Sequence, residues 1–143
     1  MELTVKPFDR LTCSELYEIL QTRMAVFVVE QACPYPDIDG ADQQALHIML
    51  RENGKLLAYL RVFSQDEDTA RIGRVLATER RKGYATAVLQ AGIQAAREQL
   101  GARAVYLEAQ TYAMSLYEKE GFRPVTEVFL EDGIPHIGMQ LNF

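Results

Sequence analysis

A basic loop that opens a predicted helix is the most specific chemical feature of the sequence. It holds three cationic and two small residues, in the order Arg80, Arg81, Lys82, Gly83, Tyr84 and Ala85. The first turn of a helix has backbone N–H groups without partners, and the helix dipole adds partial positive charge there. Small residues let a pyrophosphate approach those amides, and the cations can add charge-assisted hydrogen bonds. Residues 80–85 therefore predict a phosphate-binding loop.

The alternative interpretation of this loop is an ordinary helix start with close packing at Gly83 and Ala85. The sequence has no Gly-x-x-x-x-Gly-Lys-Ser/Thr run, which excludes a nucleotide P-loop. It also has no Gly-x-Gly-x-x-Gly run, which argues against a dinucleotide site of the Rossmann type.

A second pattern begins at Gln110 and ends at Phe122. Within it, Tyr117 lies in a predicted short helix that follows a predicted strand, and Gly121 ends that helix. Aromatic residues at helical spacing usually belong to the core, so Tyr117 can be interpreted as packing alone. The two patterns occur in this order, thirty residues apart, each on an element that suits it. That combination is much rarer by chance than either pattern by itself.

Periodicity and turn residues predict the elements that position both patterns. Strands are expected at residues 2–6, 45–51, 55–63, 69–76, 104–108, 122–130 and 134–141. Helices are expected after the capping box Thr12–Glu15, with a break near 26–29, and at 83–100 and 112–120. Turns at 52–54 and 131–133 predict hairpins, and residues 31–44 form a predicted loop.

The order of these elements predicts an α/β (α+β) fold. Three middle strands joined by turns imply antiparallel pairing, and two strand–helix–strand crossovers imply parallel pairing. The expected architecture is a mixed, mainly antiparallel central sheet of about seven strands with helices on both faces.

The composition is that of a soluble globular protein, with 48% apolar and 24% charged residues. A length of 143 residues fits one domain, which we expect to span residues 1–143. The longest apolar run, Met24 to Val29, has six residues, whereas a membrane span needs about twenty. Because no export signal opens the sequence, a cytoplasmic location is expected, with Cys13 and Cys33 as free thiols.

Charge is distributed unevenly along the chain. The net charge of −5 makes general nucleic-acid binding a poor prediction. Residues 71–82 hold five basic side chains against Glu79 alone, a net of +4, so the remaining residues carry −9. A small basic segment in an acidic chain favours a small anionic ligand, and a solvated loop is the alternative.

Together the two patterns resemble those of the GNAT acyltransferase superfamily, which transfers an acyl group from coenzyme A to an amine. Residues 80–85 match the Arg/Gln-x-x-Gly-x-Gly/Ala motif that holds the CoA pyrophosphate, with Ala85 where the strictest motif has Gly. Residues 110–122 resemble the motif with the catalytic tyrosine, and Gln110 stands where Asn is commoner. The resemblance covers nearly the whole chain, and further segments resemble the ElaA-like branch, at 23–31, 39–42, 73–75 and 131–136.

The resemblance implies an N-acetyltransferase with acetyl-CoA as cosubstrate and no metal. A neutral amine would attack the thioester directly in a ternary complex. Tyr117 would protonate the leaving thiolate, since a phenol with a pKa of about 10 is protonated at neutral pH. A backbone N–H near Val75 or Leu76 would stabilise the oxyanion. CoA would contact these two residues, residues 80–85 and Gln110.

Four residues are candidates for the general base: Glu30, Asp39, His47 and His136. His47 lies within a predicted strand and fits a structural role better. Glu30 and His136 are the preferred candidates, because the resemblance implies that the exit of the first helix and the last hairpin meet at the acceptor end. Each also has a structural alternative: solvation of a helix end for Glu30, and a local hydrogen bond for His136.

The acceptor is expected to be a small-molecule or peptidyl amine with positive charge. The acidic residues that favour such an amine are Glu30, Asp37, Asp39, Asp42, Glu131 and Asp132. No nucleic acid or membrane partner is expected, and the choice between monomer and homodimer stays open. Three other functions also stay open: transfer of a longer acyl group, a CoA-binding sensor or interaction module without turnover, and a purely structural domain.

Overall fold

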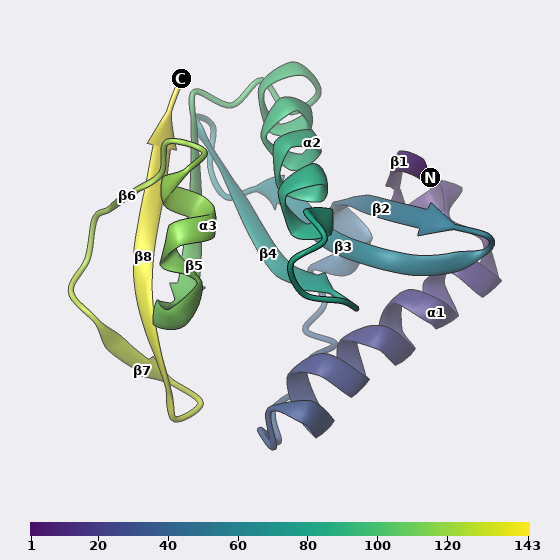
Figure 1. The fold of residues 1–143 in the computed structure, drawn as a ribbon. Coiled ribbons are helices and arrows are strands. Elements are labelled where there is room, and N and C mark those ends of the chain that lie inside the picture. Colours follow the sequence, from purple (N-terminus) through teal and green to yellow (C-terminus); the bar gives the residue numbers. More distant parts are fainter.

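A mixed sheet of eight strands with helices on both faces forms the fold, in a computed structural model that describes residues 1–143 (Figure 1). The strands are β1 (Glu2–Pro7), β2 (Leu46–Glu52), β3 (Lys55–Ser64), β4 (Thr69–Ala77), β5 (Ala104–Gln110), β6 (Arg123–Pro124), β7 (Phe129–Glu131) and β8 (Ile134–Asn142). The α-helices are α1 (Cys13–Arg23), α2 (Tyr84–Glu98) and α3 (Met114–Glu118). A π-helix, η2 (Met24–Glu30), continues α1, and 3₁₀ turns are η1 (Phe8–Arg10), η3 (Asp42–Gln44) and η4 (Thr111–Ala113). None of the helices combines the length and apolar character needed to cross a lipid bilayer.

The first helix begins at the predicted capping box and changes pitch where a break was expected. Thr12 Oγ1 accepts a hydrogen bond from the backbone N–H of Glu15 (3.0 Å), and the Glu15 carboxylate accepts one from the N–H of Thr12 (2.8 Å). These bonds satisfy N–H groups that lack partners at a helix start. From Met24 to Glu30 the chain winds in wide π turns, which are frequent at functional sites, so the helix loosens rather than stops.

Both predicted hairpin turns are present. Asn53 and Gly54 have φ angles of 52° and 76°, and Asp132 and Gly133 have φ angles of 51° and 76°. Positive φ at both central positions gives the mirror-image turn that matches the twist of paired strands.

The expected strand at 122–130 is wrong, because the chain divides there into β6 and β7 and raises the strand count to eight. The interruption coincides with a side-chain hydrogen bond between the two segments. Thr126 Oγ1 accepts the hydrogen bond from the Gly138 N–H (2.8 Å) that a strand carbonyl would otherwise accept. A side chain thus replaces part of the ladder, and residues 125–128 lie outside both strands.

Only one of the two expected crossovers produces parallel pairing. The strand order is β1-β2-β3-β4-β5-β8-β6, with β7 also on β8, and the crossover through α2 makes β4 and β5 parallel. β1 is antiparallel to β2, and the last residue of β1, Pro7, lies opposite the first residue of β2, Leu46. The segment with α1 and η2 therefore connects two strand ends at the same edge of the sheet. β8 lies between β5 and β6 and is antiparallel to both, so the crossover through α3 brings no parallel neighbours together.

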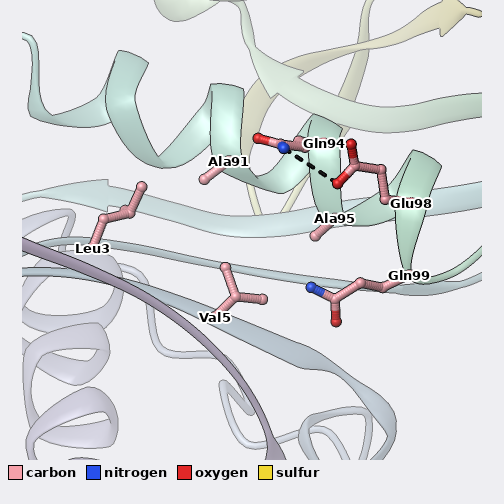
Figure 2. A pocket seen from close by; sticks show the side chains of 7 residues that line it. All are labelled: Leu3, Val5, Ala91, Gln94, Ala95, Glu98 and Gln99. Atoms are coloured by element: carbon pink, nitrogen blue, oxygen red, sulfur yellow. Dashed lines mark hydrogen bonds between the residues drawn. The ribbon is translucent and has the colours of Figure 1, made fainter.

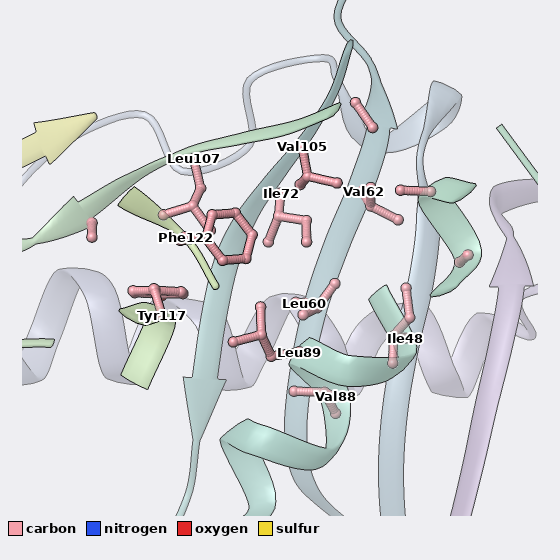
Figure 3. Packing of buried hydrophobic residues seen from close by; sticks show 14 of the residues in the cluster. Ile48, Leu60, Val62, Ile72, Val88, Leu89, Val105, Leu107, Tyr117 and Phe122 are labelled. Carbon is pink, nitrogen blue, oxygen red and sulfur yellow. The ribbon is translucent and has the colours of Figure 1, made fainter. Parts of the chain in front are cut away.

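Separate apolar clusters cover the two faces of the sheet. The larger cluster packs against α2 and α3 and includes Leu60, Ile72, Leu89, Leu107 and Phe122 (Figure 3). The smaller cluster lies under α1 and consists of Ile19, Met49, Leu56, Tyr59 and Leu76. Successive strand residues therefore point to opposite covered faces, which confirms the prediction of helices on both sides.

Candidate active site

The parallel strands β4 and β5 separate partway along their length. They pair only where Thr69–Arg71 face Ala104–Tyr106. Further along, β4 stays paired with β3, and β5 stays paired with β8 as far as Gln110, while β4 and β5 diverge (Figure 1). We call this region, bordered by residues 72–77 and 107–110, the β4–β5 divergence. The strand edges that face each other there are free to hydrogen-bond a bound molecule.

A β-bulge lies on β4 at the β4–β5 divergence. Between the pairs Gly73–Arg61 and Leu76–Tyr59, β4 has two residues where β3 has one. Arg74, inside the bulge, has a φ of 56°, a left-handed conformation that is unfavourable for a residue with a side chain. The bulge changes the direction of the backbone next to Val75 and Leu76, the two residues whose N–H groups are expected to stabilise an oxyanion.

The predicted phosphate-binding loop is the uncapped start of α2. Gly83, the N-cap residue, has a φ of 76°, and no side chain caps the helix. The first backbone hydrogen bond runs from the Ala87 N–H to the Gly83 carbonyl (3.1 Å), so the N–H groups of residues 84–86 have no backbone partner. A Cβ placed on Gly83 would meet no atom within 4 Å, which shows that the space beside the loop is open. This geometry is that of an anion site at a helix start.

The basic segment 71–82 contains paired and unpaired cations. Arg71 pairs with Glu108 (2.7 Å) and Arg74 pairs with Asp37 (2.8 Å), so neither arginine is free to hold an anion. The other three cations, Arg80, Arg81 and Lys82, are exposed beside the start of α2. The positive field expected from five basic side chains is therefore carried by these three.

Tyr117 on α3 combines a core position with an unpaired hydroxyl. Its ring packs edge-on against Phe122, with ring centroids 6.1 Å apart, and 7% of the residue is exposed (Figure 3). Burial raises the pKa of the Tyr117 phenol well above its ordinary value, with a smaller contribution from Tyr112, and no hydrogen bond from another group stabilises either form. The ring is thus a core aromatic, and its hydroxyl stays protonated and unengaged.

The end of η2, the end of β5 and the last hairpin border one region. Gln110 Nε2 donates a hydrogen bond to Gln31 Oε1 (3.2 Å), which joins residues 79 positions apart. Cys33 Sγ lies 3.5 Å from the backbone oxygen of Asp132, in the β7–β8 turn. The exit of the first helix and the last hairpin therefore meet, next to the β4–β5 divergence. The sequence predicts that Gln110 contacts CoA, and its hydrogen bond to Gln31, the residue after η2, was not foreseen.

The two preferred base candidates differ in how they are held. His136 lies opposite Gln110 in the β5–β8 ladder. Its Nδ1 donates to the Ile134 carbonyl (2.7 Å), so Nε2 is the basic nitrogen of the neutral ring and lies 3.8 Å from Glu131 Oε2. Glu30, the last residue of η2, is exposed to solvent. The local hydrogen bond expected for His136 is present, and it orients the ring without occupying Nε2.

His47 and Asp39, the other two base candidates, are engaged within the fold. His47 is fully buried, with Nδ1 2.6 Å from the Tyr59 hydroxyl and Nε2 2.8 Å from the Asp42 carbonyl oxygen. A carbonyl only accepts, so Nε2 carries the proton and Nδ1 accepts from Tyr59. Burial is the main cause that lowers the pKa of His47, and the ring is neutral. Asp39 pairs with Arg61 (2.6 Å).

A charge network under the loop that follows η2, buried except at Asp39 and Arg74, was not predicted. Three arginines meet three aspartates: Arg23, Arg61 and Arg74 with Asp37, Asp39 and Asp42. Arg23 is 0% exposed and Arg61 is 4% exposed. The sequence signals that could have indicated this network are an arginine directly before an apolar helical run and two aspartates three residues apart. Most of the acidic loop expected to attract an amine is thus neutralised within the fold.

Two hollows lie outside the predicted phosphate-binding loop. The larger, about 480 Å³, is mainly apolar and is lined by Tyr17, Leu20, Gln21, Met24, Ala25, Val29, Asp37 and Ile38. The smaller, about 200 Å³, lies between β1 and the last turns of α2, where Gln94 donates to Glu98 (3.2 Å) (Figure 2). It borders the end of α2 farthest from Gly83, so it is not part of the predicted CoA site.

The chain is similar to known acyltransferases over almost its whole length. The family described as "Acetyltransferase (GNAT) domain" matches residues 15–143. Protein ElaA of Escherichia coli (strain K12) is 44% identical over 137 residues, which cover 92% of this chain and 90% of that protein. The crystal structure of E. coli ElaA gives a TM-score of 0.92 at 40% identity and covers 98% of this chain and 99% of that chain.

Two further solved structures share the fold. An acyl-CoA N-acyltransferase from Pseudomonas aeruginosa gives a TM-score of 0.90 at 42% identity and covers 98% of this chain and 99% of that chain. A GNAT family acetyltransferase from Elizabethkingia anophelis, with acetyl-CoA bound, gives a TM-score of 0.68 at 16% identity over 99% of this chain and 98% of that chain.

Proposed function

Because this chain belongs to the GNAT acetyltransferase family, we propose that it transfers an acetyl group from acetyl-CoA to a primary amine. Both substrates would bind in one ternary complex, and residues 1–143 would act as one catalytic domain. One observation supports this most strongly: the β4–β5 divergence and the uncapped start of α2 both lie at the end of β4. A free strand edge thus adjoins an anion site, which suits a ligand with amides at one end and phosphates at the other.

The residues at this place fit acetyl-CoA. The N–H groups of residues 84–86 and the cations at 80–82 would hold the pyrophosphate. The free edges of residues 72–77 and 107–110 would hydrogen-bond the pantetheine amides as a neighbouring strand would. The E. anophelis acetyltransferase, of the same fold with acetyl-CoA bound, supports this cosubstrate. Gln110, already bonded to Gln31, would lie near the acyl end.

The proposed chemistry uses Tyr117 as the acid. As the amine nitrogen bonds to the thioester carbon, the N–H of Val75 or Leu76 would stabilise the developing oxyanion. As the C–S bond breaks, Tyr117 would give its proton to the sulfur, and its raised pKa keeps that proton in place until then. The proton lost by the amine would pass to Glu30 or His136, directly or through water.

The acceptor class also follows from charge. The three aspartates of the charge network are neutralised by arginines, so they would not bind the amine. The exposed carboxylates left near the end of η2 and the last hairpin are Glu30, Glu131 and Asp132. We infer a small-molecule or peptidyl amine with positive charge, attracted by these three groups.

An amine screen with acetyl-CoA, followed by the release of CoA thiol, tests the proposal. The panel should contain polyamines, peptides with free N-termini, lysine side chains, and neutral and anionic amines. Turnover with a cationic amine is expected. If CoA stabilises the fold but no amine releases thiol, the protein is a CoA-binding module without turnover. A preferred anionic acceptor would refute the acceptor class and leave the acyl transfer in place.

A further inference from the structure

The bulge on β4 contains an unfavourable backbone conformation that other contacts must stabilise. Arg74 sits inside the bulge with a φ of 56°, where a side chain clashes with its own backbone. Glycine would adopt this conformation without strain, yet the position carries the long side chain of arginine. An unfavourable backbone conformation persists only where the surrounding structure determines it.

The Arg74 side chain makes the contacts that could do so. Its Nε donates to Asp37 Oδ1 (2.8 Å), and its Nη2 donates to the Asp37 carbonyl (3.1 Å) and to Asp39 Oδ2 (3.3 Å). The guanidinium also lies over the Tyr35 ring, 5.4 Å from its centroid, and the Tyr35 hydroxyl donates to Asp37 Oδ1 (2.6 Å). The Arg74 guanidinium thus joins the bulge to the loop at 35–39.

The loop is itself anchored on both sides of the bulge. Arg23, fully buried at the end of α1, donates from Nε to Asp37 Oδ2 (2.9 Å). Arg61, which faces Gly73 across the β3–β4 ladder, donates to Asp39 from two nitrogens (2.6 and 2.8 Å). The bulge is therefore tied to rigid elements rather than to a free loop.

We propose that Arg74 is a positioning residue, whose pairing with Asp37 and Asp39 fixes the bulge so that the backbone N–H of Val75 or Leu76 is aimed at the thioester carbonyl. This inference rests on the proposed function. A donor that is already aimed needs no reorganisation when the oxyanion forms, so a small misorientation lowers the rate strongly. The guanidinium itself stays on the loop side and does not touch the substrate.

Difference infrared spectroscopy of bound acetyl-CoA, labelled with carbon-13 at the carbonyl, tests this without knowledge of the acceptor. In the wild-type protein, a hydrogen bond to the carbonyl should lower its stretching frequency relative to free acetyl-CoA. Arg74→Gly removes the hydrogen bonds to Asp37 and Asp39, while glycine adopts the positive φ without strain. The variant should lose roughly half of that shift or more, while acetyl-CoA affinity stays within about threefold. With an amine found in the screen, kcat should also fall by about 10²-fold.

Arg74→Gly is expected to fold, because Asp37 keeps Arg23 and Asp39 keeps Arg61 as partners. If it does not fold, Arg74→Lys carries the test, since lysine keeps the charge without the planar fork and should give an intermediate shift. Arg71→Ala is the matched control: it removes an arginine from the same strand before the bulge, and it should keep the wild-type frequency.

The outcomes separate the inference from the proposed function. If the carbonyl stretching frequency shifts equally in the wild-type protein and in Arg74→Gly, Arg74 does not position the donor, and the acyltransferase function stands. Where only Arg74→Lys folds, the same comparison is made with that variant. If acetyl-CoA does not bind to the wild-type protein at all, the proposed function fails and the inference fails with it. A shift lost in the glycine variant and kept in Arg71→Ala supports the inference.

Discussion

At the scale of single residues, Tyr117 shows that core packing and proton donation are compatible in one side chain. The sequence offered them as alternatives. The ring packs against Phe122 within the larger apolar cluster, yet its hydroxyl has no hydrogen-bond partner in the chain. A buried phenol of this kind stays protonated, so it is ready to act as an acid but contributes little to stability through its oxygen.

Tyr117→Phe therefore should lower kcat by roughly 10²–10⁴ with little change in stability. The substitution removes only an unpaired hydroxyl, so no buried partner is left unsatisfied. Steady-state kinetics and thermal unfolding measure the two effects. Tyr112→Phe, which removes an exposed phenol from the preceding turn, is the matched control and should be active. An active Tyr117→Phe enzyme with lower stability would show that Tyr117 is only a core residue.

Glu30→Gln and His136→Gln should separate substrate binding from proton removal. If Glu30 only attracts the amine, Glu30→Gln should raise KM for the amine more than it lowers kcat. If the free Nε2 of His136 is the base, His136→Gln should lower kcat and remove the acid limb of its pH profile. The kcat profile measures the second effect directly. A large loss of kcat in Glu30→Gln, with the acid limb of His136→Gln unchanged, would assign the base to Glu30.

Which candidates are free to act could not be read from the sequence. His47 and Asp39 have the right chemical types, but the structure gives them the partners Tyr59 and Arg61. Both partners lie on β3, and Arg61 reaches the loop after η2 only because β3 passes beneath it in the folded sheet. Hydrogen-bond partners of this kind depend on the tertiary fold, so residue type alone overestimates the number of available bases.

At the scale of elements, features set by neighbouring residues were predictable and features set by strand pairing were not. The capping box at Thr12 and the two hairpin turns depend on side chains within four residues of each other. The β-bulge and the β4–β5 divergence depend on which strand lies beside β4 and for how long. No local pattern encodes that register, and the strand at 122–130 failed for the same reason, since its ladder bond goes to a threonine side chain.

Gly83→Val should weaken CoA binding about tenfold or more without a matching effect on pantetheine, which lacks the phosphates. Valine at a φ of 76° is strained, and its side chain would cover the amides at the start of α2. Thermal shift measures binding: CoA at a hundred times its Kd should stabilise the wild-type protein by about 2.7 kcal/mol.

Gly54→Val is the matched control for this element, because Gly54 has the same φ of 76° and equally open surroundings in the β2–β3 turn. It should cost similar stability and leave CoA binding unchanged. Equal stabilisation by CoA and pantetheine, or unchanged CoA affinity in Gly83→Val, would remove the phosphate-binding role of the loop.

At the scale of the whole molecule, charge is organised differently from its order along the chain. The sequence separates a basic segment from an acidic remainder, which suggested opposite fields at the two substrate ends. The fold instead brings arginines from α1, β3 and β4 onto the three aspartates of the loop after η2. The three aspartates are neutralised there, whereas Arg74 is the only cation of the basic segment that takes part, and Arg80, Arg81 and Lys82 stay exposed. Removing one member, as in Arg23→Ala, would leave the buried Asp37 and Asp42 with one arginine each, Arg74 and Arg61, and should lower the free energy of unfolding.

This arrangement predicts that the free energy of unfolding falls in two steps as pH decreases. Burial lowers the pKa of His47, so below about pH 6.5 the unfolded chain binds a proton that the folded chain does not. Arg61 lowers the pKa of Asp39 well below its usual range. Burial acts to raise the pKa of Asp42, but Arg23 and Arg61 outweigh it and lower the pKa. The stability that these carboxylates contribute is present above their unfolded pKa of about 3.9 and is lost below it.

Urea unfolding at about pH 7, 5.5, 4.5 and 3.5 measures both steps, and each proton adds a slope of at most about 1.4 kcal/mol per pH unit. His47→Gln should remove the upper step, because glutamine does not titrate. Asp39→Asn should flatten the decline between the two lowest pH values and leave the upper step in place. Stability that stays constant from about pH 7 to 4.5 in the wild-type protein would show that His47 is not held neutral. A decline at low pH that is equally steep in Asp39→Asn would show that the network does not hold that carboxylate ionised.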